Sequence, residues 1–459
     1  MPPLLASFLT VGFIVFLFRR DFRERPNVTG ALWIPALWIF FMASRPPGQW
    51  LRIASLPVVG GSVEEGNPLD GTVFLVLTLA GLYVLNQRRV GLSEFVRNNQ
   101  WLVVFFLYCF IAIFWSDFPV SAFKRWIKIM GHPIMVLVIF SEPDPMGALV
   151  TLLKRVAFVV FPVSILWIKY YPNLGRISQE WGEMGTCGIA GGKNAMGGIC
   201  LIFGLFFLWH FFQVLRMEKA VSRRNELRLT AFLLWMIGYC LLKLDSATSE
   251  LCLLLGIAIM VLLGLRTLNI RLIGAYALAA GVILVIAQLA FDVYGGIVNV
   301  SGHESTIEGR SRLWHTLLET DSDPIFGTGF ESYWLGERLE KIWAMPEFQW
   351  RPTQAHNGYL ETYLNLGVVG LFILIGFILA TFYKCRRELL RNFEWGRFRM
   401  SCLVAILAHN WTEAGFKGLS LFFFAFFLIA IDCPALEIAA PRASLEATSP
   451  EEEPELIYS

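Results

Sequence analysis

The chain has 459 residues, of which 56% are hydrophobic and only 16% are charged, and its formal net charge is +2. A soluble domain carries about 25% charged residues, so this composition excludes an ordinary soluble protein. The small net charge also excludes the basic field by which nucleic-acid-binding domains attract phosphate backbones. Apolar blocks with few internal charges instead predict a helical membrane protein.

Hydrophobic stretches follow one another along the whole chain and are separated by polar segments. Their length and composition suit helices that cross the roughly 30 Å hydrocarbon layer of a membrane. The twelfth stretch is the shortest, and we expect it to be tilted or half-buried. The sequence thus predicts an all-α, polytopic integral membrane protein with about twelve to thirteen transmembrane helices. The predicted spans are residues 4–18, 29–43, 72–86, 100–115, 127–140, 150–168, 195–214, 229–243, 249–265, 272–292, 358–383, 400–411 and 418–433.

Lys and Arg are divided unevenly between the two sets of segments that connect the predicted spans. The segments after odd-numbered spans, together with the C-terminal tail, hold more than half of the 38 Lys and Arg residues. Because basic residues favour the cytoplasmic side of a membrane, these segments are predicted to be cytoplasmic. We therefore expect a multi-pass protein with a cytoplasmic C-terminus and with segment 293–357 on the opposite side. In a bacterial inner (cytoplasmic) membrane, that side is the periplasm.

The same pattern divides the chain into four parts. Residues 1–292 hold transmembrane helices one to ten, and residues 293–357 form a large periplasmic loop. Residues 358–433 hold transmembrane helices eleven to thirteen. Residues 434–459 are rich in Pro, Ser and Glu and are predicted to form a disordered cytoplasmic tail.

The large loop carries the arginine motif Gly-Arg-Ser-Arg-Leu-Trp, residues 309–314. A guanidinium group offers five donors in a planar fork that suits phosphate. Arg310 and Arg312 are two residues apart and diverge on a helix, so only one of them need face a site. The alternative for both residues is that they are ordinary surface arginines that bind no ligand. Trp314 is suited to stacking on a sugar or to anchoring at the membrane interface.

Two further motifs lie where outward segments enter predicted spans. Histidine takes up and releases protons near neutral pH, so His356 is suited to act as a general base, or else to cap the helix that follows. Asn357 suits the N-cap of that helix as well as it suits a catalytic role. Lys193 follows two glycines and could bind phosphate oxygens or extend its amine to the membrane interface. Together these residues indicate chemistry on an anionic, membrane-bound substrate.

The sequence shows no metal-binding pattern. Its 6 histidines have no HxxH or HExxH spacing, and its 8 cysteines form no CxxC pair. We therefore expect no metal site and no cofactor, and we interpret the cysteines as small buried hydrophobic residues.

Taken together, the outward motifs resemble those of the O-antigen ligase/polymerase superfamily, and within it the exopolysaccharide-production (Wzy-type) branch. Their order along residues 44–371 and their shared location on one predicted face carry the resemblance. The matching pieces are Ser44-Arg45-Pro46 with Glu65-Gly66-Asn67-Pro68-Leu69-Asp70, Trp115-Ser116-Asp117-Phe118-Pro119 with Lys124-Arg125, Lys193-Asn194-Ala195-Met196-Gly197, Gly309-Arg310 with Leu313-Trp314, Gly327-Thr328-Gly329-Phe330, and His356-Asn357-Gly358-Tyr359-Leu360 followed by Leu366-Gly367-Val368-Val369-Gly370.

The resemblance implies a GT-C-like membrane glycosyltransferase whose donor is an undecaprenyl-pyrophosphate-linked oligosaccharide, used without a metal or a nucleotide. It implies that Arg310 holds the pyrophosphate and that His356 acts at the acceptor, as the catalytic pair in the periplasmic loop. Binding of the pyrophosphate or the glycan is expected of Lys193, Arg176, Arg312, Trp314 and Asn357.

One departure from the family's pattern concerns the short segment Ser246-Ala247-Thr248-Ser249. Many members carry a basic residue there, whereas this chain has Ala247. Either Lys243, Arg176 or Lys193 takes its place, or the second phosphate contact differs.

The resemblance implies a polysaccharide polymerase that transfers a growing glycan from undecaprenyl pyrophosphate to the non-reducing end of a lipid-linked repeat unit in exopolysaccharide biosynthesis. Two alternatives stay open: a ligase that moves glycan to lipid A-core or to protein, and a transporter or flippase of lipid-linked glycan. Transporters place binding residues near the membrane midplane in broken helices, whereas the motifs here gather at one interface. The lipid bilayer is an expected partner, a chain-length regulator and a flippase are candidate partners, and nucleic acid is not expected.

Overall fold

The computed structural model describes residues 1–24, 26–58, 60, 66–178, 184–244, 246–265, 269–276, 279, 304–320, 322–348 and 350–433. Most of the predicted tenth span, the first part of the predicted periplasmic loop and the predicted disordered tail lie outside the described residues.

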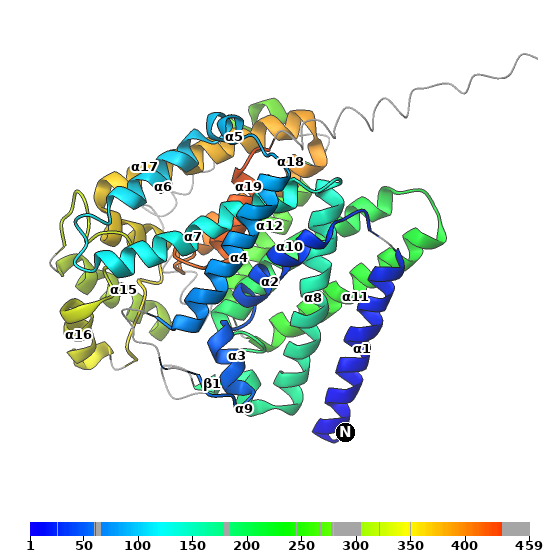
Figure 1. Cartoon of the computed structure of the whole chain (residues 1–459), viewed down its shortest axis with the longest axis horizontal. Helices are drawn as coiled ribbons and strands as arrows, with labels where there is room; N and C mark the ends of the chain where they lie inside the picture. The colour runs from blue at the N-terminus through cyan, green and yellow to red at the C-terminus, as the bar shows by residue number, and fades with distance from the viewer. Residues whose placement is uncertain are drawn as a thin grey trace, which may run out of the picture.

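The described chain is almost entirely helical (Figure 1). Six of the described helices are long and apolar enough to cross a membrane, by length and composition. They are α1 (Pro3–Glu24), α4 (Pro68–Gln87), α8 (Pro145–Tyr170), α10 (Lys193–Arg216), α11 (Val221–Leu244) and α17 (Gly358–Arg391).

Further helices complete the bundle. They are α2 (Trp33–Met42), α6 (Gln100–Ile111), α7 (Pro119–Phe140), α12 (Ala247–Leu263), α18 (Phe393–His409) and α19 (Leu421–Ala430). Each predicted span except the tenth coincides with a described helix. The predicted all-α, polytopic membrane class is therefore confirmed.

Short elements connect the bundle helices. They are the 3-10 turns η1 (Gly30–Leu32), η2 (Ile270–Leu272) and η3 (Pro346–Phe348), the helices α3 (Pro47–Ile53), α5 (Leu92–Asn98), α9 (Pro172–Gly175), α15 (Glu304–Glu319) and α16 (Gly336–Ala344), and the strands β1 (Arg176–Ser178) and β2 (Met184–Thr186). The two strands pair antiparallel, with Arg176 opposite Thr186.

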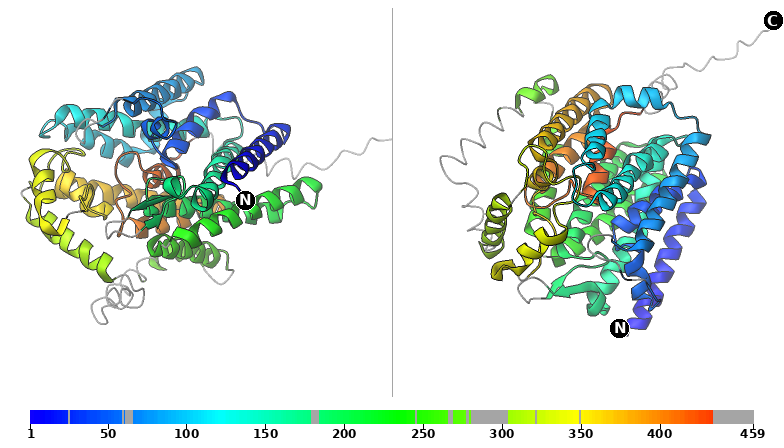
Figure 2. Two further views of the ribbon diagram at one scale, coloured as in Figure 1. Left: turned by 90° about the horizontal axis from the view of Figure 1, so that it is seen from below. Right: turned by 60° about the vertical axis from the view of Figure 1, so that its left-hand side comes forward.

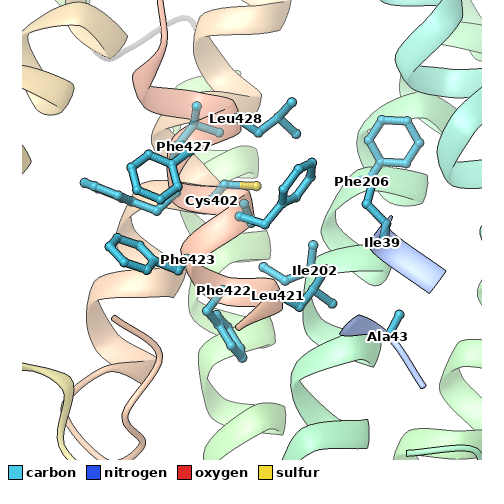
Figure 3. Close-up of a cluster of buried hydrophobic side chains, with 14 of the residues drawn as sticks. Ile39, Ala43, Ile202, Phe206, Cys402, Leu421, Phe422, Phe423, Phe427 and Leu428 are labelled. Carbon is cyan, nitrogen blue, oxygen red and sulfur yellow. The ribbon is translucent and has the colours of Figure 1, made fainter. Parts of the chain in front are cut away.

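Helix α19 lies inside the bundle (Figure 3). Its sequence is apolar on every face, and all 10 of its residues are buried. A helix that is apolar all round is stable only where every face is covered. It contacts α7, α10, α17 and α18, and within it the Phe423 and Phe427 ring centroids lie 4.5 Å apart. The helices that carry the outward motifs are thus packed around one buried helix.

Charged side chains at one set of helix ends are paired with one another. Each pair joins two ends that the predicted alternation of spans places on the same side of the membrane. Buried charges need such partners because an unpaired one is costly in a low dielectric. The pairing of these helix ends is therefore compatible with spans that alternate in direction across the membrane. The pairs are Asp21 with Arg155 (2.8 Å), Arg88 with Glu142 (2.5 Å), Lys154 with Glu226 (2.9 Å) and Arg399 with Asp432 (3.0 Å).

Motifs of the first outward segment act as internal tethers. Arg45 donates to the Leu174 carbonyl at 2.6 Å and so joins the end of α2 to α9. Asn67 caps α4 with its side chain, and Asp70 in the first turn of α4 accepts a backbone N–H of α3 at 2.6 Å. These motif residues hold connecting segments against each other.

Helix α17 is broken at Gly367, whose φ of 65° and ψ of −168° are not helical. The N–H groups of Val368 and Val369 donate instead to the carbonyls of Pro324 (2.9 Å) and Ile325 (3.2 Å). The break therefore gives the long loop before α17 a docking point on a membrane helix.

Gly327 and Gly329 belong to this docked segment. Both residues have positive φ, 70° and 93°, which glycine adopts without strain. Trp115, after α6, donates its indole N–H to the Phe326 carbonyl at 3.2 Å. The loop is thus held by two different parts of the bundle.

We expect Gly367→Ala to destabilise the protein by about 2 kcal/mol or more, because a Cβ there would collide with the Ile325 carbonyl and the positive φ disfavours alanine. Gly12→Ala in α1 is the matched control, since a Cβ at Gly12 would meet nothing within 4 Å. Thermal unfolding of the purified variants in one detergent measures both. Equal midpoints for Gly367→Ala and wild type would contradict the docking.

Candidate functional site

A cavity of about 660 Å³ lies among the second turn of α15, the first turn of α10 and the segments that precede α17 and α19. Figure 2 shows α15 and α16, coloured yellow-green and yellow, at one side of the helix bundle. Lys193, Arg310 and His356 all line the cavity. Three motifs that are far apart in the sequence therefore meet in one place.

The carboxylate of Glu413, between α18 and α19, joins these motifs. One oxygen accepts from the Arg310 guanidinium at 2.6 Å and from the Asn194 amide at 2.7 Å. The other lies 3.1 Å from His356 Nδ1. An ionised carboxylate can only accept, so Nδ1 carries a proton and Nε2 is left for another partner.

Glu413 is ionised because of these neighbours. Burial by itself raises the pKa of the carboxyl group, but the hydrogen bond from His356, together with the nearby charge of Arg310, outweighs it and lowers the pKa to about 2. Ionisation of a buried carboxyl group requires donors and cations of this kind. The cavity wall therefore holds a fixed negative charge matched by the Arg310 cation.

His356 lies in a constrained turn. Its φ is 50°, a region that few residues other than glycine occupy. Trp314 donates its indole N–H to the Ala355 carbonyl at 2.7 Å, and Glu361 accepts the Ala355 N–H at 2.8 Å. Asn357 then caps α17 by accepting two N–H groups of its first turn. A conformation of this kind persists where surrounding contacts enforce it, and such conformations cluster at functional sites.

A second ion pair supports the same turn. Lys417 lies 2.9 Å from Glu361 and donates to the Thr353 carbonyl at 2.8 Å. Glu361 also accepts the indole N–H of Trp334 at 2.8 Å. The start of α17 is thus tied both to the segment before α19 and to the large loop.

The other predicted site residues lie outside the cavity lining. Arg312 is on the same helix as Arg310 but is exposed, as their spacing predicts, and Arg176 is an exposed residue of β1. Trp314 and Asn357 fix the turn before α17. Three of the seven predicted residues therefore share the cavity.

Three residues were expected to replace the basic residue that is missing near Ala247, and one of them lines the cavity. Lys193 lines it, whereas Lys243 and Arg176 do not.

Sequence patterns do not single out Glu413 or His409, which also line the cavity. Glu413 is the only carboxylate in the short segment 410–420 between two apolar spans. Because a carboxylate in such a place needs a cationic partner, that isolation is the signal that could have revealed it. His409 lies at the end of an apolar span and gives no comparable signal.

Among the described residues, no group of three or more His, Cys, Asp or Glu side chains could hold a metal ion. All 8 cysteines are described, buried and not joined in disulfides.

The fold and the cavity define a multi-pass helical membrane protein with a charged site built from connecting segments. A model of the O-antigen ligase family matches residues 231–375. The exopolysaccharide production protein ExoQ of Rhizobium meliloti (strain 1021) is 25% identical over 339 residues, which cover 69% of this chain and 72% of ExoQ. The chain is thus similar to proteins of the O-antigen ligase family in its central and C-terminal part, and to ExoQ over most of its length. The matched region includes Arg310 and His356, whereas Lys193 and Glu413 lie outside it.

We expect Glu413→Gln to lower the stability at neutral pH by on the order of 2 kcal/mol, because Arg310 loses its counter-charge in a mostly buried setting. The stabilisation from the ionised carboxylate is present above its ordinary pKa of 4.5 and is lost as the pH falls towards 2.

The thermal midpoints of wild type and Glu413→Gln should therefore differ at pH 7 and converge as the pH is lowered from about 5. Scanning fluorimetry in an acid-stable detergent measures both curves. A constant difference down to the lowest pH at which the protein stays dispersed would contradict the assigned ion pair.

Proposed function

We propose that this protein is a membrane glycosyltransferase and, more specifically, a polysaccharide polymerase. Its reaction would transfer a growing glycan from undecaprenyl pyrophosphate to the non-reducing end of a lipid-linked repeat unit in exopolysaccharide biosynthesis. The observation that carries the proposal is the cavity that Lys193, Arg310 and His356 share. The match to a model described as O-antigen ligase, and a similar protein named as an exopolysaccharide production protein, support the same activity.

In the proposed reaction the donor already carries a good leaving group. The acceptor hydroxyl oxygen forms a bond to the anomeric carbon of the donor glycan, and the bond from that carbon to the pyrophosphate oxygen breaks. The electron pair leaves with the lipid pyrophosphate, so the enzyme must mainly position the reactants and stabilise negative charge. Lys193 and Arg310 are two of the cations that line this cavity.

The acceptor hydroxyl must also lose its proton. His356 Nε2 accepts it in the proposed reaction, because Nδ1 already donates to Glu413. The same contact stabilises the imidazolium that forms. Glu413 thus orients the base His356, in addition to compensating the positive charge of Arg310.

The proposed setting is the bacterial inner membrane, with the cavity on the periplasmic side and the C-terminus in the cytoplasm. The division of Lys and Arg between the connecting segments supports this orientation. A flippase that delivers lipid-linked repeats and a regulator of chain length are the partners such a reaction would use.

A ligase is the second candidate, because the matching family model is described as O-antigen ligase. It would use the same donor and the same cavity but a different acceptor, lipid A-core or protein. A transporter of lipid-linked glycan is less well supported, since the cavity is lined largely by connecting segments and helix ends.

We expect Arg310→Ala and His356→Ala each to lower polymer formation at least about a hundredfold when they replace the wild-type protein in a deletion strain. The measurement is the amount and length of surface polysaccharide together with the lipid-linked intermediates. Arg52→Ala and His315→Ala are matched controls, because both residues are exposed and lie outside the cavity lining.

Accumulation of single lipid-linked repeats at normal protein levels would support the polymerase. Full-length polymer left on its carrier would favour the ligase. Wild-type polymer from both cavity variants would contradict the assignment of the site.

A further inference from the structure

His132 of α7 is a fully buried histidine that lies outside the cavity lining, and both of its ring nitrogens have partners. Nε2 lies 3.0 Å from the Gly418 carbonyl oxygen, and Nδ1 lies 3.3 Å from the indole nitrogen of Trp38 in α2. A carbonyl can only accept and an indole N–H can only donate, so Nε2 carries the proton and Nδ1 does not. The two contacts therefore fix one tautomer of a neutral imidazole.

Aromatic packing holds this imidazole in place. Its ring stacks on that of Phe427 with centroids 5.8 Å apart, and lies 6.1 Å from that of Phe423; Figure 3 shows both rings on α19. The indole of Trp38 is fully buried, and a Cβ at Gly131 would lie only 2.0 Å from it. The glycine beside His132 thus leaves the space that the Trp38 ring needs. The imidazole is therefore held between α2 and α19.

The carbonyl group that His132 binds belongs to one wall of the cavity. Gly418 lies in the wall segment, residues 410–420, which joins α18 to α19 and carries Glu413 and Lys417. All three of these residues line the cavity. Gly418 has a φ of 44°, which glycine adopts without strain. The His132 hydrogen bond thus ties the wall segment to the helix bundle.

The wall segment in turn contacts the turn that carries His356. Lys417 directly precedes Gly418 and lies 2.9 Å from Glu361 in the first turn of α17. Glu413, five residues before Gly418, lies 3.1 Å from His356 Nδ1. A shift of the Gly418 carbonyl would therefore change both contacts. Displacements of about 1 Å near a reacting group can lower a rate by a large factor.

We propose that His132 is a positioning residue for glycan transfer, because its bond to Gly418 sets the wall segment and thereby the base His356. Its effect on transfer rests on the proposed glycosyltransferase function, whereas the tether itself can be measured without a substrate. His132 acts through the wall segment and does not touch the reacting atoms. Loss of its Nε2 donor therefore slows transfer and leaves substrate binding nearly unchanged.

The first measurement is hydrogen exchange of the wall segment, by mass spectrometry on the full-length protein in nanodiscs. His132→Phe keeps a ring but removes both nitrogens, so we expect the amides of residues 410–420 to exchange at least about threefold faster. His132→Gln can place an amide N–H near the former Nε2, and we expect it to restore most of the protection. Trp38→Phe removes the donor to Nδ1 and should give a smaller change in the same direction.

Trp209→Phe is the matched control for Trp38→Phe. Trp209 of α10 is also a buried tryptophan, and its indole N–H donates to the Glu394 carbonyl of α18 at 2.9 Å. Both residues lie about 20 Å along their helices from the residues of α10 and α18 that line the cavity. We therefore expect Trp209→Phe to leave wall-segment exchange and transfer at wild-type levels.

The second measurement is glycan transfer from a defined lipid-linked repeat in the same preparations. We expect His132→Phe to lower kcat about tenfold with KM within about twofold, and His132→Gln to recover kcat to within about threefold of wild type. Thermal midpoints show which variants are folded. If His132→Phe does not fold, Trp38→Phe against Trp209→Phe decides, with an expected loss of about threefold in kcat.

Wild-type kcat in the folded His132→Phe and Trp38→Phe proteins would overturn the inference. So would unchanged exchange of the wall segment, or an equal loss of kcat in His132→Gln and His132→Phe. A wild-type protein that transfers no glycan, but whose wall segment depends on His132, would support the tether and contradict the proposed function. Transfer by wild type that His132→Phe leaves unchanged would support the function and overturn the positioning role.

Discussion

The site depends on the contacts that the buried carboxylate of Glu413 makes with its cationic and hydrogen-bonding partners. A charge in such a place costs several kcal/mol unless cations and donors surround it. Its partners come from three separate elements: Arg310 of α15, Asn194 of α10 and His356 in the turn before α17. Satisfying one carboxylate therefore brings together segments that the chain order keeps far apart. The cavity lies between these segments, and Glu413 is part of its wall.

The long loop before α17 must be held rigidly for Arg310 to reach this carboxylate. The break at Gly367 supplies the attachment, because two N–H groups of α17 bond to loop carbonyls rather than within the helix. Trp314 adds a link from α15 to the turn that carries His356. The same contacts that fix the loop to the bundle thus fix the proposed base relative to the cation.

The membrane helices and three cavity residues could be predicted from the sequence, because hydropathy and motif position depend on local composition. The role of Glu413 could not, since it depends on distances between helices that are remote in the chain. The helices of the large loop were also missed, although Leu313 and Leu317, four residues apart, are buried on one face of α15. The exposure of Arg312 could be predicted, because residues two apart on a helix point in different directions and Arg310 faces the cavity. The position of Arg176 in a short strand had no local signature.

The most direct test of the account is transfer by the purified protein in liposomes that contain a defined lipid-linked repeat. We expect the glycan to lengthen in steps of one repeat, with one molecule of free undecaprenyl pyrophosphate released for each new bond. Repeats that stay on their carrier with no pyrophosphate lipid released, or intact lipid-linked glycan that only crosses the bilayer, would contradict it.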